Sequence, residues 1–259
     1  MEKKVTISIA ILLFSAMLFA QSNNPQIKQA SVGKGLIYSR ERVYFGEVGT
    51  NGMSLGFQWG KLKSYYKTTY YQVTFGYLRN PKETRSSITN ASFSLGRSFI
   101  YGKQNSLMKV NLLMGGKKYF TEKDAVRGVA VGMSYAIGPE LGLLKPYYVD
   151  YFLPIEKPAR KNNYIKYTPE TAEKFLDIDK INGAAPFTEG LKEIKIQPGV
   201  HAKLGLHFDW GAYDEYVRAL EVGISGDFFL KKTPILVENA QNRPFFLNLY
   251  ANLQLGKRK

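Results

Sequence analysis

The sequence predicts an all-β protein, a transmembrane antiparallel up-and-down β-barrel of about ten strands with one long external loop that carries a short helix. Apolar residues recur at every second position along most of the chain from Gly52 onward. The positions between them hold mainly small or uncharged residues, which fit a crowded barrel interior. Connections between the candidate strands alternate between short and long, as expected when both chain ends face the periplasm.

The alternation is clearest in two segments in the second half of the sequence. Apolar side chains occupy every second position from Phe245 to Leu255, and again from Val200 to Trp210. Two other segments are weak, since Arg40 and Arg42 share the apolar face of one and Pro146 interrupts another. If the weak segments lie outside the ring, eight strands remain. The candidate strands cover residues 36–47, 52–60, 68–78, 90–101, 106–114, 127–137, 141–152, 200–210, 216–230 and 245–256.

The polar face of these strands distinguishes a membrane barrel from a soluble one. A face in water would carry many charges, and strands rich in Gly and Ser would be weak there. In this sequence the polar face holds Ser54, Gly56, Gln58 and Gly60, then Asn90, Ser92, Ser94, Gly96 and Ser98, then Gly128, Ala130, Gly132 and Ser134. We therefore expect this face to line the barrel and the apolar face to meet lipid.

The connections give an independent indication. Short links are expected near Ser64, Gln104, Pro139 and Tyr213, and long ones near Lys82, near Phe120, at 154–198 and at 233–242. A short link near Gly49 breaks the alternation. The aromatic residues beside the short links predict an interfacial girdle, the alternative being aromatics scattered as ordinary strand formers. The girdle candidates are Trp59, Tyr71, Tyr101, Tyr135, Trp210 and Tyr216.

The beginning of the sequence has the pattern of an export signal. Lys3 and Lys4 precede an apolar stretch, and Ala20 is a small residue suited to cleavage. We expect residues 1–20 to be a signal peptide, 21–35 an N-terminal periplasmic segment, and 36–259 the barrel domain. The chain has no cysteine, which excludes disulfides. After the signal no apolar stretch is long enough for a membrane helix, so a span would have to be made of strands.

The formal net charge is +15, so the chain is strongly basic. A protein exported to the outer membrane of a Gram-negative envelope does not meet nucleic acid. The polyanions within its reach are lipopolysaccharide phosphates and other envelope components. We therefore expect outer-membrane lipid, lipopolysaccharide and other envelope proteins as partners.

The segment 153–198 is predicted to be the long external loop. It is too long for an ordinary connection, so we expect it to fold. Thr168 followed by Pro169 is typical of a helix start, with the helix running to about Phe175. A small basic group in the loop, Lys157, Arg160 and Lys161, is a candidate for interaction with phosphates or an acidic partner, or else is an ordinary solvated loop.

Charged residues on the predicted inner face form a candidate lumen network. The simple interpretation is a set of ion pairs that fills the barrel, and a proton or ion path along Lys203, Glu221 and Asp227 is the alternative. His207 and Asp209 are same-face neighbours, so the carboxylate could orient the imidazole as a general base. His201 with Ser225 is a weaker hydrolase candidate at the outer rim. The network comprises Lys109, His201, Lys203, His207, Asp209, Glu221 and Asp227.

No metal site or cofactor is predicted. The two histidines lie six residues apart on one strand, about 20 Å, and cannot share an ion. The stretch from Asp177 to Gly183 has two acidic residues before a glycine, but Ile181 stands where a calcium loop needs an oxygen ligand. The sequence also lacks a phosphate-binding glycine loop.

Three sequence blocks resemble a family of uncharacterised outer-membrane β-barrel proteins. They are Gly138-Pro-Glu-Leu-Gly-Leu-Leu-Lys-Pro146, Ala219-Leu-Glu-Val-Gly-Ile-Ser225 and Asn248-Leu-Tyr-Ala-Asn-Leu-Gln-Leu-Gly-Lys257. The resemblance runs from about Leu36 to the end and implies the fold and an outer-membrane location. It implies no activity.

We therefore expect a non-enzymatic outer-membrane barrel. Its predicted role is an accessory or structural subunit of an envelope complex for secretion, assembly or import, which binds partners through the long loop. A narrow channel or small-solute transporter is the first alternative, and a hydrolase at the outer rim is the second.

Overall fold

The computed structural model describes residues 38–86, 98–121, 128–151, 164–211, 215–237 and 242–259. The chain divides into two units, Met1–Gly35 and Leu36–Lys259. The expected signal peptide and N-terminal periplasmic segment lie outside the described residues and stay predictions. Leu36–Lys259 contains every element discussed below.

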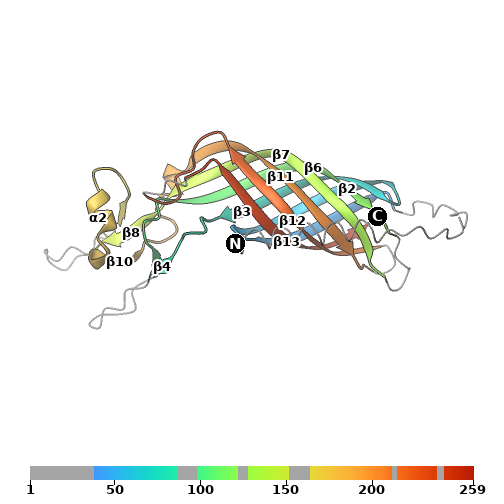
Figure 1. Ribbon diagram of the computed structural model, residues 1–259, viewed down its shortest axis with the longest axis horizontal. Helices are drawn as coiled ribbons and strands as arrows, with labels where there is room; N and C mark the ends of the chain where they lie inside the picture. The colour runs from blue at the N-terminus through green and yellow to red at the C-terminus, as the bar shows by residue number, and fades with distance from the viewer. Residues whose placement is uncertain (1–37, 87–97, 122–127, 152–163, 212–214, 238–241) are drawn as a thin grey trace, which may run out of the picture. The chain divides into compact units, whose positions relative to one another are not determined.

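Eight antiparallel strands close into a barrel in which each strand pairs with two neighbours (Figure 1). The ring order is β1-β13-β12-β11-β7-β6-β3-β2, so ring neighbours follow one another in chain order, except where the first strand, β1, pairs with the last, β13. This confirms the predicted up-and-down barrel, with the lower of the two strand counts. The strands are β1 (Arg40–Gly49), β2 (Gly52–Ser64), β3 (Lys67–Leu78), β6 (Asn105–Tyr119), β7 (Ala130–Pro146), β11 (Lys195–Asp209), β12 (Tyr216–Phe229) and β13 (Phe245–Arg258).

The strands are staggered around the ring. A path along paired residues, followed once around the barrel, starts beside Ser39 and returns to the same strand at Gly49. A stagger of this kind tilts the strands against the barrel axis. In an eight-stranded barrel the interior is then just wide enough for side chains to fill.

The count of ten was wrong for two reasons. The described end of the expected strand at 90–101 is not part of the ring: it forms β5 (Phe99–Ile100), which pairs with the short β4 (Arg85–Ser86). The expected strands at 127–137 and 141–152 are one strand, β7, which runs through Pro139. Gly138 and Pro139 have no paired residue on β6, although Pro139 pairs with Val200 of β11, so the strand tolerates the missing N–H.

The first ring strand begins and the last ring strand ends at the same end of the barrel, which we call the terminal end. We call the opposite end the loop end. At the terminal end β1 begins, β13 ends, and the links 65–66, 120–129 and 210–215 connect strands. The link near Phe120 therefore lies with the short links, not with the long ones as predicted. The loop end carries the tight link 50–51 and the long links 79–104, 147–194 and 230–244.

The barrel has apolar residues outside and polar residues inside. Large apolar side chains are exposed on the outer face of every ring strand, among them Leu55, Leu112, Ile137, Leu204 and Leu249. Inward positions hold buried polar and charged residues instead. This polarity is the reverse of a water-soluble domain and is that of transmembrane barrels. None of the described helices is long and apolar enough to span a membrane.

The described part of the link 147–194, between β7 and β11, forms a small folded unit at the loop end, which we call the loop subdomain (Figure 1). It contains a three-stranded sheet of β8 (Tyr148–Tyr151), β9 (Tyr164–Lys166) and β10 (Ile181–Ala184), the helix α2 (Ala172–Leu176), and the 3-10 helices η1 (Ile178–Lys180) and η2 (Leu191–Glu193). Its apolar core consists of Val149, Phe175 and Ile181, joined by Phe99.

The loop subdomain differs from the prediction in its boundaries. Helix α2 begins at Ala172, because Thr168 and Thr171 first form a turn in which the Thr171 N–H donates to the Thr168 hydroxyl oxygen. The expected loop 153–198 is shifted, since β8 precedes it and β11 already begins at Lys195. Pro198 is part of β11 rather than of the loop.

An apolar cluster, which we call the cap, lies at the loop end. It combines buried residues of five ring strands with two from the link after β12, namely Leu78, Leu107, Leu144, Phe229, Phe246, Ile235 and Leu236. The link is fixed by backbone hydrogen bonds from Gln104 and Asn105 to the Ile235 carbonyl. Beside it, the buried Lys103 bonds to the Tyr77 hydroxyl and pairs with Glu83 at 2.9 Å.

Candidate functional site

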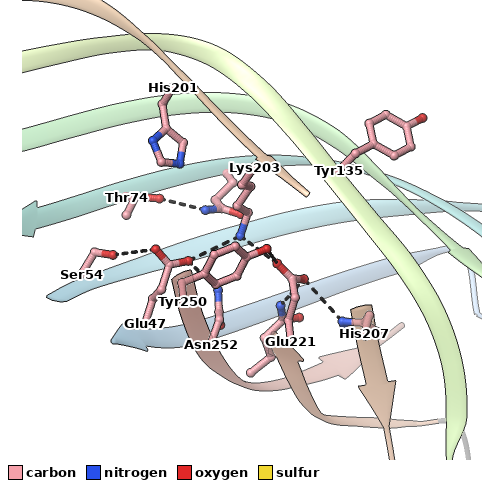
Figure 2. Close-up of polar contacts among 12 residues, drawn as sticks. Glu47, Ser54, Thr74, Tyr135, His201, Lys203, His207, Glu221, Tyr250 and Asn252 are labelled. Carbon is pink, nitrogen blue, oxygen red and sulfur yellow. Dashed lines mark hydrogen bonds and ion pairs between the residues drawn. The ribbon is translucent and has the colours of Figure 1, made fainter. Parts of the chain in front are cut away.

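The centre of the barrel interior is an ion-pair cluster (Figure 2). The Lys203 ammonium lies 3.1 Å from a Glu221 carboxylate oxygen and 3.7 Å from one of Glu47. All three are buried, and the Lys203 amine also lies over the rings of Phe45 and Tyr250. A buried ammonium is strongly disfavoured without such partners. Glu221 is not directly opposite Lys203 on β12, where Ser225 stands, so the two side chains reach each other along the barrel interior.

Neutral side chains complete the coordination of both carboxylates. Glu221 accepts hydrogen bonds from the Tyr250 hydroxyl at 2.7 Å and from the Gln254 amide at 3.1 Å. Glu47 accepts from Ser54 and Asn252, each at 3.2 Å (Figure 2). Because five ring strands contribute to these contacts, the cluster ties opposite parts of the wall together.

A glycine makes room for this cluster. Gly205 faces inward between Lys203 and His207. A Cβ atom there would lie 2.6 Å from the Tyr250 hydroxyl oxygen and 3.2 Å from Glu221 Cγ. A side chain at this position would therefore displace the Tyr250 hydrogen bond, which explains why a glycine is required in the middle of a strand.

A second cluster lies toward the loop end. The Asp227 carboxylate accepts hydrogen bonds from the Lys109 ammonium and, at 2.9 Å, from the Asn248 amide. His201 Nδ1 lies 2.7 Å from the same carboxylate. Glu140, from the adjacent β7, completes it, with an oxygen 3.8 Å from the Lys109 amine. Ser225 does not pair with His201 on β11; it is opposite Lys203, while His201 is opposite Asp227.

Ligand atoms of Glu140, His201 and Asp227 lie within 4.8 Å of one another, a spacing that a metal ion could use. However, Lys109 already supplies a positive charge to both carboxylates. A cation would have to displace its ammonium group, so the arrangement does not fit a metal centre.

A third cluster fills the terminal end. Glu41 pairs with Lys117 at 3.1 Å, and Arg258 pairs with Asp209 at 2.8 Å and with Glu41 at 3.5 Å. His207 is not oriented by Asp209, as the sequence suggested, because Asp209 is engaged by Arg258. The imidazole instead lies 3.5 Å from Glu221, its cross-strand neighbour (Figure 2).

All seven residues of the predicted lumen network lie buried inside the barrel. Among the described residues, five more charged side chains share this interior and were not predicted: Glu41, Glu47, Lys117, Glu140 and Arg258. Glu41 and Glu47 occupy the alternate positions of the segment that Arg40 and Arg42 made doubtful. Alternation extended through that segment would have placed both inside.

The predicted girdle residues are all exposed on the outer surface. Trp59, Tyr71, Tyr135, Trp210 and Tyr216 lie toward the terminal end, whereas Tyr101 lies at the loop end, where its hydroxyl donates to the Leu176 carbonyl. The placement of Tyr101 beside a short link was therefore wrong. Tyr44 and Phe57 were not among the predicted residues, yet their rings continue the row that Trp59 and Tyr71 form.

On the loop subdomain, an exposed charged pair links β9 to η2. The Lys166 ammonium bonds to Glu193, which also accepts from the Tyr148 hydroxyl at 2.9 Å. The hydrogen bond from Lys166 holds the pKa of Glu193 below its ordinary value, and the same bond raises the pKa of Lys166. The basic candidates Lys157, Arg160 and Lys161 lie outside the described residues.

The interior holds a small cavity toward the loop end. A cavity of about 20 Å³, lined partly by Glu47, Ser54, Lys109 and Tyr250, holds no more than one water molecule. Together with the ion-pair clusters and the cap, it leaves a barrel filled by its own side chains. The structure thus defines a closed, filled barrel of the outer-membrane type.

Comparisons with known proteins give no further information on the function of this barrel. No family model matches the chain, and no curated protein matches it. Among solved structures, the chain is similar to the N-terminal β-barrel domain of Pseudomonas aeruginosa OprF, with 8% identity, a TM-score of 0.34, and coverage of 86% of this chain and 98% of that one. A likeness at that level carries no argument about function, and the resemblance to an uncharacterised family stays a prediction.

Proposed function

We propose that this protein is a non-enzymatic outer-membrane barrel that anchors the loop subdomain at the cell surface, where it binds another envelope protein as an accessory subunit of a secretion, assembly or import complex. The observation that carries the proposal is the contrast between a filled interior and a separately folded loop. A filled barrel is suited to anchoring rather than transport, and a loop with its own core presents a defined surface.

The outer surface supports the membrane location. The apolar side chains exposed on all ring strands would be costly in water, and the aromatic row at the terminal end suits a lipid–water interface. With chain ends of such barrels in the periplasm, the terminal end faces the periplasm and the loop subdomain faces outward.

The loop subdomain also exposes apolar side chains that its own core does not cover. Ile178 is 42% exposed, Phe187 65% and Leu191 41%. Exposed apolar residues around a small rigid unit are typical of protein interaction sites. The interaction is therefore expected to depend on these three side chains.

The test is a variant with three apolar side chains replaced, Ile178→Ser, Phe187→Ser and Leu191→Ser. Its control replaces three exposed charged side chains of the same subdomain, Glu173→Ser, Lys174→Ser and Lys192→Ser. Native gel electrophoresis after gentle detergent extraction would measure the size of the complex. We expect the apolar triple to release the barrel as a smaller species and the control to leave the complex intact. Identical migration of wild type and apolar triple at the mass of a single chain would contradict the proposal.

A channel is the main competing function, and the ion-pair clusters disfavour it. Lys203 and Glu221 close the middle of the barrel and the cap closes the loop end. Planar-bilayer recordings are expected to show no stable conductance. A steady conductance that Leu107→Ala in the cap increases would favour the channel instead.

A further inference from the structure

Basic side chains form a belt on the outer surface at the terminal end. They occupy outward positions on six consecutive ring strands, from β12 through β13, β1, β2 and β3 to β6, and all are exposed. We define the basic belt as Arg218, Lys257, Arg40, Arg42, Lys61, Lys63, Lys67 and Lys118. In the described part of the chain, the side-chain carboxylate paired with the belt is Glu215, which lies 2.7 Å from Lys257.

The belt brings like charges together. Arg42 is directly opposite Lys257 on the paired strand, and Arg40 is opposite Lys61. Lys67 is likewise opposite Lys118. Like charges at directly opposed positions repel and destabilise a sheet unless an anion lies between them. Because the described residues supply one carboxylate, Glu215, to these opposed cations, the repeated arrangement favours a counter-anion from outside the described part of the chain.

The position of the belt indicates which anion it meets. Arg42 is directly opposite Trp59, and the Lys257 amine lies 5.6 Å from the centre of the Tyr216 ring. Lys61 follows Trp59 by two residues on the same face of β2. The belt therefore adjoins the aromatic row, the level at which lipid headgroups begin, and long basic side chains can reach phosphates there while their stems stay apolar.

We propose that the basic belt binds the phosphodiester headgroups of anionic phospholipids in the periplasmic leaflet. The inference rests on the proposed membrane location and orientation. Each phosphate would lie between two opposed cations, such as Arg42 and Lys257, and relieve their repulsion. Lipopolysaccharide occupies the other leaflet in that orientation, so phospholipid is the occupant to which the geometry points.

The experiment uses the natural reporters at this end of the barrel. The chain has two tryptophans, Trp59 and Trp210, and both lie beside the terminal end. Bromine on a lipid chain quenches tryptophan fluorescence by contact. The full chain is placed in vesicles of brominated phosphatidylglycerol with ordinary phosphatidylcholine, and separately in vesicles in which the phosphatidylcholine is brominated instead. Comparing the quenching in the two preparations shows which lipid lies around the terminal end. We expect phosphatidylglycerol to be preferred, and the preference to fall with added salt.

The test variant is Arg42→Gln with Lys61→Gln and Lys118→Gln. Its matched control removes the same charge at exposed positions of the loop end, Lys195→Gln, Lys231→Gln and Lys232→Gln. We expect the preference for phosphatidylglycerol to fall roughly fivefold for each belt cation removed, and not to change in the control. If the test variant fails to fold, the salt dependence of the wild-type preference decides.

The outcomes separate this inference from the proposed function. Equal quenching by both brominated lipids would overturn the belt as a headgroup site while leaving membrane insertion intact, because quenching itself requires lipid contact. No quenching by either lipid would contradict the membrane location itself. A preference that survives the triple substitution, or lipopolysaccharide that displaces phosphatidylglycerol from the tryptophans, would also overturn the inference.

Discussion

The barrel and the loop subdomain are built on opposite principles within one chain. In the loop subdomain Val149, Phe175 and Ile181 are buried and the charged pair of Lys166 and Glu193 is exposed. In the barrel Leu204 and Leu249 are exposed while Lys203 and Glu221 are buried. The surrounding solvent, rather than residue type alone, therefore decides which side chains form a core.

The largest expected effect is on the apolar core of the loop subdomain. Phe175→Ala removes a fully buried ring from a very small core, and such truncations cost about 3–5 kcal/mol. We expect the loop subdomain to unfold and become sensitive to trypsin, while the barrel itself stays folded and resistant. Phe75→Ala, which truncates a ring exposed on the barrel, is the control and should leave the subdomain resistant. Loss of the barrel in Phe175→Ala would mean that the two regions are not separate.

The second largest expected effect is on the central ion-pair cluster of the barrel. Among the described carboxylates, Glu221→Gln leaves Lys203 with Glu47, at 3.7 Å, and breaking a buried pair costs about 3 kcal/mol or more. Urea unfolding in vesicles, followed by tryptophan fluorescence, measures this loss. Adding Lys203→Met together with Glu47→Gln removes the remaining buried charges of this cluster and should restore most of the stability, whereas Glu193→Gln on the exposed pair should change little. Full stability of Glu221→Gln alone would show that the ion pairs do not hold the wall together.

A smaller loss of stability is expected when a side chain is added at Gly205, beside the central ion-pair cluster. Gly205→Ala places a methyl group 2.6 Å from the Tyr250 hydroxyl oxygen and should cost about 1–3 kcal/mol. Gly46→Ala is a matched control, because the nearest atom to its Cβ lies at an ordinary 3.6 Å. The same unfolding assay applies, and equal stability of the two variants would contradict the proposed role of Gly205.

The smallest effect is the pH dependence of the exposed pair. The pKa of Glu193 is lowered by folding, so its stabilisation is present above the ordinary glutamate pKa and is lost as the pH falls through the lowered value. The pKa of Lys166 is raised, so its share is lost only as the pH rises through the raised value. Hydrogen exchange of β9, corrected for the intrinsic rate, should quicken at acid pH in the wild type. In Glu193→Gln this dependence should disappear, and an unchanged profile would contradict the assignment.

Alternation was sufficient to predict the barrel wall where each strand has a regular two-residue period. The segments around Leu204 and Leu249 face outward as their pattern indicated, and the residues between them face inward. Pro139 was misinterpreted as a turn, because proline breaks only the hydrogen bond on one side and the strand can continue on the other. Periodicity alone does not distinguish these cases.

Pairing across the barrel could not be predicted from the sequence. Glu41 and Lys117 are 76 residues apart in the chain, and their contact depends on the stagger of the whole ring. The same holds for Asp209, which neighbours His207 on one strand yet pairs with Arg258 on β13. Inward facing follows from local pattern, whereas the choice of partner follows from register around the closed ring.

The pairing of β1 with β13 imposes an order on folding. These strands are the first and last of the ring, and Glu41 pairs with Arg258 across the seam. Until β13 is available, β1 and β12 each present an open edge with unpaired N–H and C=O groups. The wall therefore cannot be completed progressively as the chain emerges, and the unfinished sheet needs protection from other strands until its final segment arrives.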